Sequence, residues 1–160
     1  MTASQKVPPS ALEYAMAILA KRVYAESEIV AKLRRKNYSA AEIASAVEDC
    51  KRYSFINDEN YARDYACLLN SRGCGRLLIR RKLQMLRIPE EYIENALQII
   101  SGDELEAARR AFDFKCRMLK NEKDKYKKKQ KLYAFMVGRG YSFDLIHQLL
   151  NESEFNDEQE

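Results

Sequence analysis

Residues 69–97 read LNSRGCGRLLIRRKLQMLRIPEEYIENAL, and residues 19–47 read LAKRVYAESEIVAKLRRKNYSAAEIASAV. The two stretches align without a gap at a shift of 50 residues, and their apolar residues agree in position throughout. The identical pairs are Leu19 and Leu69, Arg22 and Arg72, Ile29 and Ile79, Lys32 and Lys82, Leu33 and Leu83, Ile43 and Ile93, and Ala46 and Ala96. Because the apolar spacing is helical, the match indicates a repeated helical unit.

A third copy of the unit appears at a shift of 103 residues from the first. This shift places Tyr38-Ser39 on Tyr141-Ser142, and it brings apolar residues of the first copy onto Leu132, Met136, Ile146 and Leu150. The sequence therefore predicts an all-α protein of three tandem three-helix repeats that form an elongated, curved helical array. We place an N-terminal arm at 1–10, the repeats at 11–55, 56–102 and 103–151, and a disordered acidic tail at 152–160.

Composition supports helix and excludes several other classes. The 160 residues include 5 Gly and 3 Pro, against about 11 and 8 at average usage. One histidine and four cysteines without a C-x-x-C pair argue against a zinc site or a disulfide framework. Neither a signal peptide nor an apolar run of membrane-spanning length is present. We therefore expect a cytoplasmic protein that does not associate with a membrane.

Helix start signals recur along the chain. Ser10-x-x-Glu13 and Ser39-x-x-Glu42 have the spacing of capping boxes, and Asp103-x-x-Glu106 is a charged version of the same pattern. Asp58 stands where its carboxylate would accept from the first free N–H groups of the helix that follows. Gly75 follows a tight break and is a candidate N-cap.

The net charge of +4 conceals strong segregation. Residues 65–89 contain no acid but hold Arg72, Arg76, Arg80, Arg81, Lys82 and Arg87. On one continuous helix, Arg76, Arg80 and Arg87 would fall within about 40° of each other. This pattern is compatible with a solvated helix face, or with a face that contacts phosphates or an acidic protein.

A second basic block covers residues 115–131, with nine basic and two acidic residues. Its centre contains Lys123, Lys125, Lys127, Lys128 and Lys129. Residues 121–129 have no apolar periodicity, so we expect a loop or frayed helix ends there. The block is either a solubilising linker or a site that attracts a polyanion. A smaller cluster consists of Arg34, Arg35 and Lys36.

Residues that would support catalysis are missing. The sequence has no Gly-rich phosphate loop. Its single imidazole, His147, stands beside Ile146 in the last predicted helix, where a packed or half-exposed histidine is the simpler interpretation. We therefore expect a binding protein without catalytic residues, a metal ion or a cofactor.

The stretch FINDENYARDY at 55–65 resembles the most characteristic segment of the RecX family of regulators. Arg72-Gly73-Cys74-Gly75, the pattern Ile79-x-x-Lys82-Leu83, and RGYSFDLI at 139–146 are similar to its later motifs, so the likeness extends from Ala11 to Leu150. In this family a glycine commonly follows the second helix of a unit. Asn37 and Arg87 stand there instead, and because arginine adopts the left-handed conformation poorly, we expect a different turn at Arg87.

The resemblance implies a monomeric protein that binds in the groove of the RecA filament on single-stranded DNA. It implies inhibition of RecA ATP hydrolysis, strand exchange and coprotease activity, with no catalytic site in the regulator itself. The basic residues that we expect at contacts with RecA or DNA are Arg34, Arg35, Lys36, Arg72, Arg76, Arg80, Arg81, Lys82, Arg87, Lys123, Lys125, Lys127, Lys128 and Lys129. Two alternatives remain: a helix-turn-helix transcriptional regulator that binds DNA directly, and a helical-repeat scaffold for other proteins.

Overall fold

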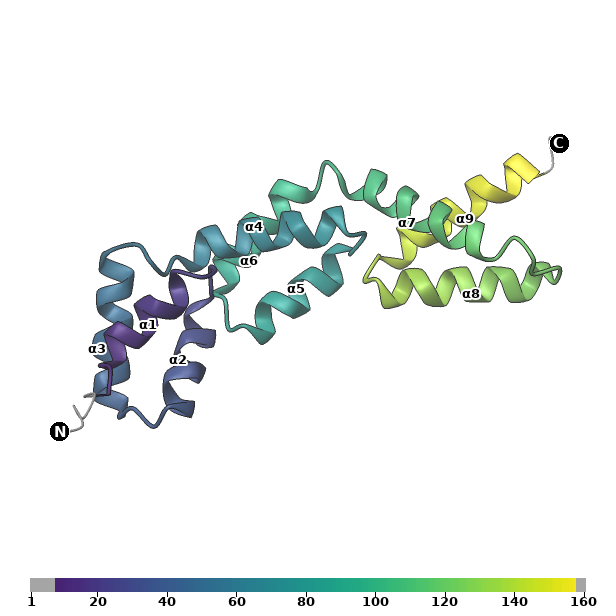
Figure 1. The fold of residues 1–160 in the computed structure, drawn as a ribbon. Coiled ribbons are helices and arrows are strands. Elements are labelled where there is room, and N and C mark those ends of the chain that lie inside the picture. Colours follow the sequence, from purple (N-terminus) through teal and green to yellow (C-terminus); the bar gives the residue numbers. More distant parts are fainter. Residues whose placement is uncertain (1–7, 158–160) are drawn as a thin grey trace.

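A computed structural model describes residues 8–157, and all of its regular structure is helical. The helices are α1 (Ala11–Leu19), α2 (Glu26–Arg35), α3 (Ala40–Arg52), α4 (Asp58–Ser71), α5 (Arg76–Met85), α6 (Glu90–Ile100), α7 (Glu104–Met118), α8 (Lys125–Gly138) and α9 (Phe143–Asp157). They form three successive three-helix units, α1–α3, α4–α6 and α7–α9, arranged in an elongated, curved array (Figure 1). The predicted fold class is therefore confirmed.

Each unit has an apolar core of its own, built from the positions that the repeat shares. Ile29 and Leu33 are fully buried in the first core, and their counterparts Ile79 and Leu83 are fully buried in the second. Met136, which corresponds to Leu33, is fully buried in the third. Burial at equivalent positions explains why the apolar phase is kept while most other residues differ.

The second helix of every unit ends in the same left-handed turn. Asn37, Arg87 and Gly140 have φ angles of 62°, 57° and 81°. In each turn the next residue's N–H donates to a carbonyl five residues back, as Ile88 does to Leu83 and Tyr141 to Met136. The expectation of a different turn at Arg87 was wrong, because these hydrogen bonds hold arginine in a conformation that it disfavours.

Helix capping agrees with the sequence in part. Ser10 and Ser39 form the predicted capping boxes with Glu13 and Glu42, and Gly75 is the N-cap of α5. The box predicted at Asp103 is wrong, since its side chain makes no cap hydrogen bond.

Asp58 caps a helix other than the one predicted. Asn57 caps α4, while Asp58 Oδ1 accepts from the backbone N–H of Glu26 at 2.9 Å. Glu104, the first residue of α7, accepts in the same way from Arg76 N–H at 3.3 Å. At both junctions, a carboxylate at the start of one unit therefore caps the second helix of the preceding unit. Local sequence patterns do not reveal such a cap, because its two residues are far apart in the sequence.

Two segments are more helical than predicted. α8 begins at Lys125, because Asp124 accepts from the N–H groups of Tyr126 and Lys127. Of the two alternatives for 121–129, the loop is therefore wrong from Lys125 onward, where a helix end lies instead. α9 continues to Asp157, and Glu152 forms an ion pair with Arg109 of α7 at 2.9 Å. The prediction of a disordered tail is therefore wrong for 152–157. Residues 158–160 of that tail, and residues 1–7 of the predicted N-terminal arm, lie outside the described residues.

Candidate functional site

The second helices of the units, α2, α5 and α8, lie end to end along one edge of the molecule, which we call the second-helix row (Figure 1). The N–H groups of Gly75 and Leu77 donate to Arg139 O and Gly140 O at 2.8 and 3.1 Å, so α5 begins at the turn that ends α8. Ser27 Oγ donates to Leu86 O, so α2 begins at the turn that ends α5. These contacts make one continuous surface from three distant sequence segments.

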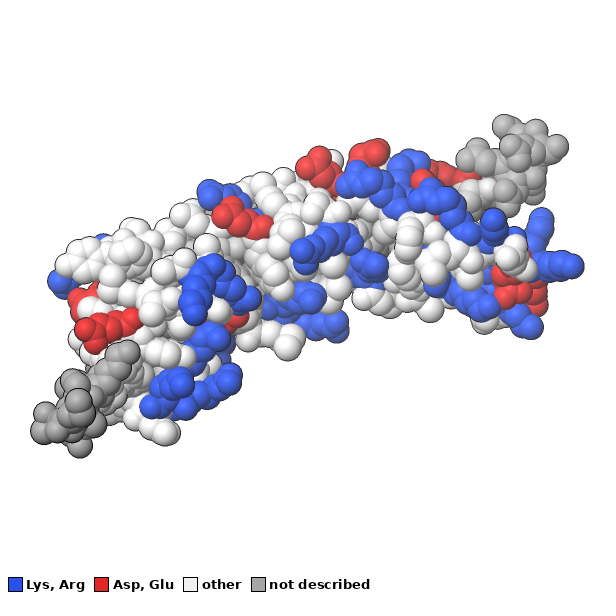
Figure 2. Space-filling view, viewed as in Figure 1, with Lys and Arg blue, Asp and Glu red and all other residues white. Residues whose placement is uncertain are grey.

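Most of the predicted basic contact residues belong to this row. They are Arg34, Arg35 and Lys36 on α2 and its cap, Arg76, Arg80, Arg81, Lys82 and Arg87 on α5 and its turn, and Lys125, Lys127, Lys128 and Lys129 on α8. Lys123 immediately precedes α8. Figure 2 shows basic side chains gathered over α2, α5 and the start of α8. The row therefore joins clusters that the sequence separates by about 40 to 50 residues.

Arg72 lies apart from the row. It is the C-cap of α4, and its carbonyl accepts from Arg139 Nη1 at 2.8 Å. Together with Arg110 and Phe114 it lines a hollow of about 320 Å³ between the second and third units. Arg110 and Arg139 were not among the predicted contacts, because they stand outside the two dense basic blocks of the sequence.

The predicted arginine stripe of the second unit is wrong in two respects. α5 ends at Met85, so Arg87 lies in the left-handed turn and not on the helix face. Arg80 forms ion pairs with Glu90 and with Glu94 of α6. The acid-free stretch is therefore partly neutralised by acids that follow it. Arg81 remains an exposed cation on α5, with Arg76 and Lys82 half-buried.

The lysines of α8 occupy an unfavourable place for helix stability. A helix N-terminus carries partial positive charge and favours acidic side chains, yet the first turn of α8 contains none and holds Lys125, Lys127 and Lys128. Asp124 and Glu122 offset them in part, with Glu122 paired to Lys131 at 2.5 Å and its pKa lowered by that hydrogen bond. α5 likewise begins with Arg76 and no acid. Positive charge at these two helix starts is therefore not explained by the fold.

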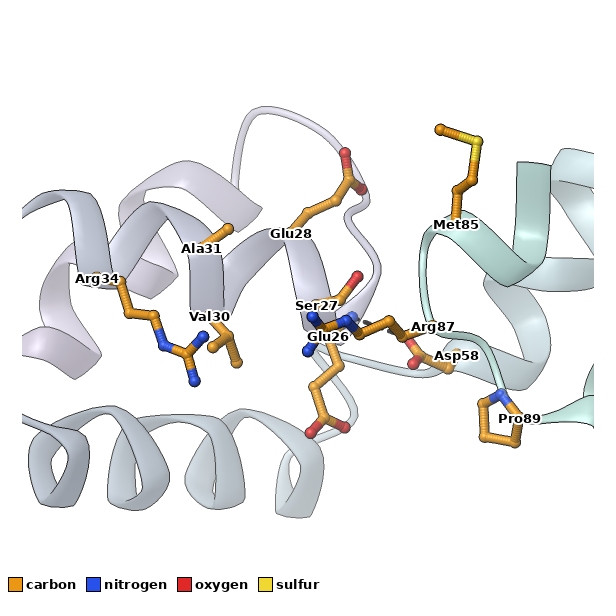
Figure 3. A pocket seen from close by; sticks show the side chains of 10 residues that line it. All are labelled: Glu26, Ser27, Glu28, Val30, Ala31, Arg34, Asp58, Met85, Arg87 and Pro89. Atoms are coloured by element: carbon orange, nitrogen blue, oxygen red, sulfur yellow. Dashed lines mark hydrogen bonds between the residues drawn. The ribbon is translucent and has the colours of Figure 1, made fainter. Parts of the chain in front are cut away.

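The first part of the row borders a hollow of about 590 Å³ between the first two units (Figure 3). Arg34 and Arg87 line it together with Glu26, Glu28 and Asp58. Burial raises the pKa of the Asp58 carboxyl above its ordinary value. Because the hollow contains both signs of charge, the positive potential of the row is weaker here than at α8.

Tyr61 of α4 is tied to this junction. Burial, followed by the nearby Glu28 carboxylate, raises the pKa of its hydroxyl to about 12. Glu28 also pairs with Arg22 at 2.9 Å, while Glu26 pairs with Lys51 at 2.9 Å. The acids of the junction are thus engaged within the protein.

An aromatic groove between α8 and α9 was missed by sequence analysis. Its side chains are Tyr126, Tyr133, Phe143 and His147, with Lys129 at its border. Tyr126, Phe143 and His147 are exposed, and Tyr133 is half-buried. A comparison of equivalent positions in the three repeats could have revealed this groove.

The side chains described in residues 8–153 include no cluster of three or more histidine, cysteine or acidic groups placed to hold a metal ion. Within the same residues, no helix is both long enough and apolar enough to span a membrane.

The fold and its basic edge define a class: all-α proteins made of tandem three-helix units. Family models described as the first, second and third three-helix domains of RecX match residues 11–50, 57–97 and 102–150. The regulatory protein RecX of Vibrio parahaemolyticus is 32% identical over 149 residues, covering 93% of each chain. That of Chlorobaculum tepidum is 30% identical over 140 residues, covering 87% of this chain and 85% of the relative.

Solved structures agree with this assignment at the level of the fold. A crystal structure of RecX from Lactobacillus salivarius superposes with a TM-score of 0.77 at 20% identity, covering 91% of this chain and 95% of the other. The chain belongs to the RecX family. Both relatives described above are named as regulatory proteins.

Proposed function

We propose that this protein binds in the groove of the RecA filament on single-stranded DNA and inhibits RecA ATP hydrolysis, strand exchange and coprotease activity. It acts as a cytoplasmic monomer, by occupying a surface and without catalysis of its own. Membership of the RecX family supports this proposal, and the resemblance of its motifs gives the partner.

The observation that carries the proposal is the second-helix row. Its three helices join end to end through inter-unit hydrogen bonds, so basic residues of all three units follow one edge of a long molecule. A helical filament that carries DNA presents a long, negatively charged groove, and such a groove matches an extended basic edge better than a compact patch.

The distribution of charge along the row argues against a helix-turn-helix reader of specific sequences. Such a reader concentrates its base contacts near the start of one recognition helix, usually in a dimer. Here α5 and α8 both begin with basic residues, and α2 ends with Arg34, Arg35 and Lys36. We therefore expect direct DNA binding to be independent of sequence and steeply weakened by salt.

The test is the single-stranded-DNA-dependent ATPase of the cognate RecA, measured with increasing amounts of this protein. We expect inhibition at substoichiometric amounts, together with sedimentation of the protein with RecA filaments. An unchanged rate together with absence from the filament pellet would contradict the proposal. A sequence-specific, weakly salt-sensitive affinity for duplex DNA would favour the transcriptional regulator instead.

A further inference from the structure

The aromatic groove of the third unit, lined by Tyr126, Tyr133, Phe143 and His147, lies beside the second-helix row. The rings of Tyr133 and Phe143 are nearly parallel, with centroids 6.2 Å apart and an interplanar angle of 4°. The Tyr133 and His147 centroids are 5.9 Å apart. Tyr126 is 70% exposed and Phe143 is 63% exposed. The hollow between Tyr126, Tyr133 and His147 has a volume of about 500 Å³, so flat ring faces remain open to an incoming group.

Comparison of the three units shows that the fold does not require these rings. Shifting Tyr133, Phe143 and His147 back by 53 residues gives Arg80, Glu90 and Glu94, the three partners of the ion-pair cluster between α5 and α6. The same positions in the first unit hold Val30, Ala40 and Ala44. These three equivalent positions therefore hold small apolar side chains in the first unit, an ion-pair cluster in the second and an aromatic cluster in the third.

The exposed rings of this groove stand among cations. Lys129 lines the hollow, and Lys125 lies one helical turn before it on the same side of α8. Lys127 and Lys128 extend the positive charge around the start of the helix. An occupant of matching chemistry has flat apolar rings joined to a negatively charged chain.

We propose that this groove stacks the unpaired bases of a single-stranded nucleic acid on Tyr126, Tyr133 and His147, while the lysines at the start of α8 contact its phosphates. Aromatic stacking suits every base, so the groove binds without regard to sequence. The inference deepens the proposed function and rests on it for the choice of DNA, but it concerns binding that occurs without RecA.

The experiment measures binding of the full chain to two fluorescein-labelled oligonucleotides, oligo(dT) and an abasic chain of the same length and number of phosphates. We expect oligo(dT) to bind at least about 5-fold more tightly, because only it offers bases for stacking. Tyr126→Ser combined with Tyr133→Leu removes that preference and leaves affinity for the abasic chain unchanged. Leucine retains apolar packing against α9, and circular dichroism during heating checks the fold.

A matched control is Tyr53→Ser, which removes another exposed tyrosine, 64% exposed, from the first unit and should leave both affinities unchanged. Equal affinity of the wild type for the two oligonucleotides, or no binding to either, overturns the proposal. A variant that loses both affinities in parallel also overturns it, since the rings would then act through the lysines or the fold. Because RecA is absent, these outcomes are independent of the ATPase test.

Discussion

The two junctions between units build the same end-to-end arrangement with different chemistry. Between the second and third units, backbone N–H groups of Gly75 and Leu77 donate directly to carbonyls of the turn that ends α8. Between the first and second units a side chain makes the corresponding contact, with Ser27 Oγ donating to Leu86 O. Both junctions share a carboxylate cap, since Asp58 accepts from Glu26 N–H and Glu104 accepts from Arg76 N–H.

Glycine explains the difference. A Cβ atom added at Gly75 would lie 2.4 Å from Gly140 O, and one at Gly140 would lie 2.3 Å from Leu78 N. The equivalent positions of the first junction are Ala25, which is fully buried, and Arg87. A hollow of about 590 Å³ lies at this first junction. We conclude that direct backbone hydrogen bonds join the second helices at the second junction, whereas the Ser27 side chain joins them at the first.

The largest effect is expected from Gly140→Ala at the second junction. The new methyl group would overlap the α5 backbone, and the left-handed φ of 81° adds strain, so we expect a loss of about 3 kcal/mol or more in the free energy of unfolding. Urea denaturation measures it. Gly138→Ala is the matched control, since nothing lies within 4 Å of its added Cβ atom. A loss below about 1 kcal/mol would mean that the close approach is easily relieved.

A smaller loss is expected from Asp58→Ala at the first junction. This change removes the acceptor of the Glu26 N–H and should cost about 1 kcal/mol, as loss of a helix cap does. Asp58→Asn keeps an acceptor oxygen and should cost less. Chemical denaturation of the two variants separates the hydrogen bond from the charge, and equal losses would show that the charge itself holds the junction.

The pH dependence of stability, compared between the wild type and Asp58→Asn, tests the burial of Asp58. Burial raises the pKa of this carboxyl in the folded chain, so the folded state binds its proton more tightly than the unfolded state. The associated stability is present below the unfolded pKa and is lost as pH rises through the higher folded pKa. Asp58→Asn should therefore gain stability relative to the wild type across that window, as followed by melting temperature. A difference in melting temperature that does not change with pH would contradict the burial of Asp58.

Arg87→Gly should stabilise the protein modestly, because glycine adopts the φ of 57° without the strain that arginine bears. We expect a gain of about 0.5–1 kcal/mol, because relief of about 1–2 kcal/mol of left-handed strain exceeds the cost of about 0.4–1 kcal/mol that glycine adds through the entropy of the unfolded chain. Thermal unfolding measures the gain. No gain would indicate that the Arg87 side chain contributes to the first junction through the hollow that it lines.

Sequence patterns were sufficient for the architecture and for part of the site. Apolar periodicity found the cores, since Ile29, Ile79 and their neighbours are buried at equivalent positions, and capping boxes at Ser10 and Ser39 need only residues three apart. Errors arose where a partner is distant. The carboxylate of Asp58 serves a helix 32 residues earlier, and Arg80 pairs with acids 10 and 14 residues later.

Charge patterns failed in a different way. The lysine run at 125–129 has no apolar period, yet Asp124 starts a helix that carries it. The aromatic groove is formed by side chains from two helices, Tyr133 of α8 and His147 of α9, and the pattern within either helix does not show that they meet. Function therefore has to be sought where units differ at equivalent positions.

The second-helix row, as we propose, binds the filament. Inhibition of RecA ATPase by the double variant Lys125→Glu and Lys128→Glu tests this most directly. Acids at the start of α8 suit the helix dipole, so thermal stability should hold or rise slightly, while inhibition should require at least about 10-fold more protein. Arg63→Glu on α4, an exposed arginine that pairs with its neighbour Asp64, is the control and should inhibit normally. Full inhibition by the stable double variant would contradict the account.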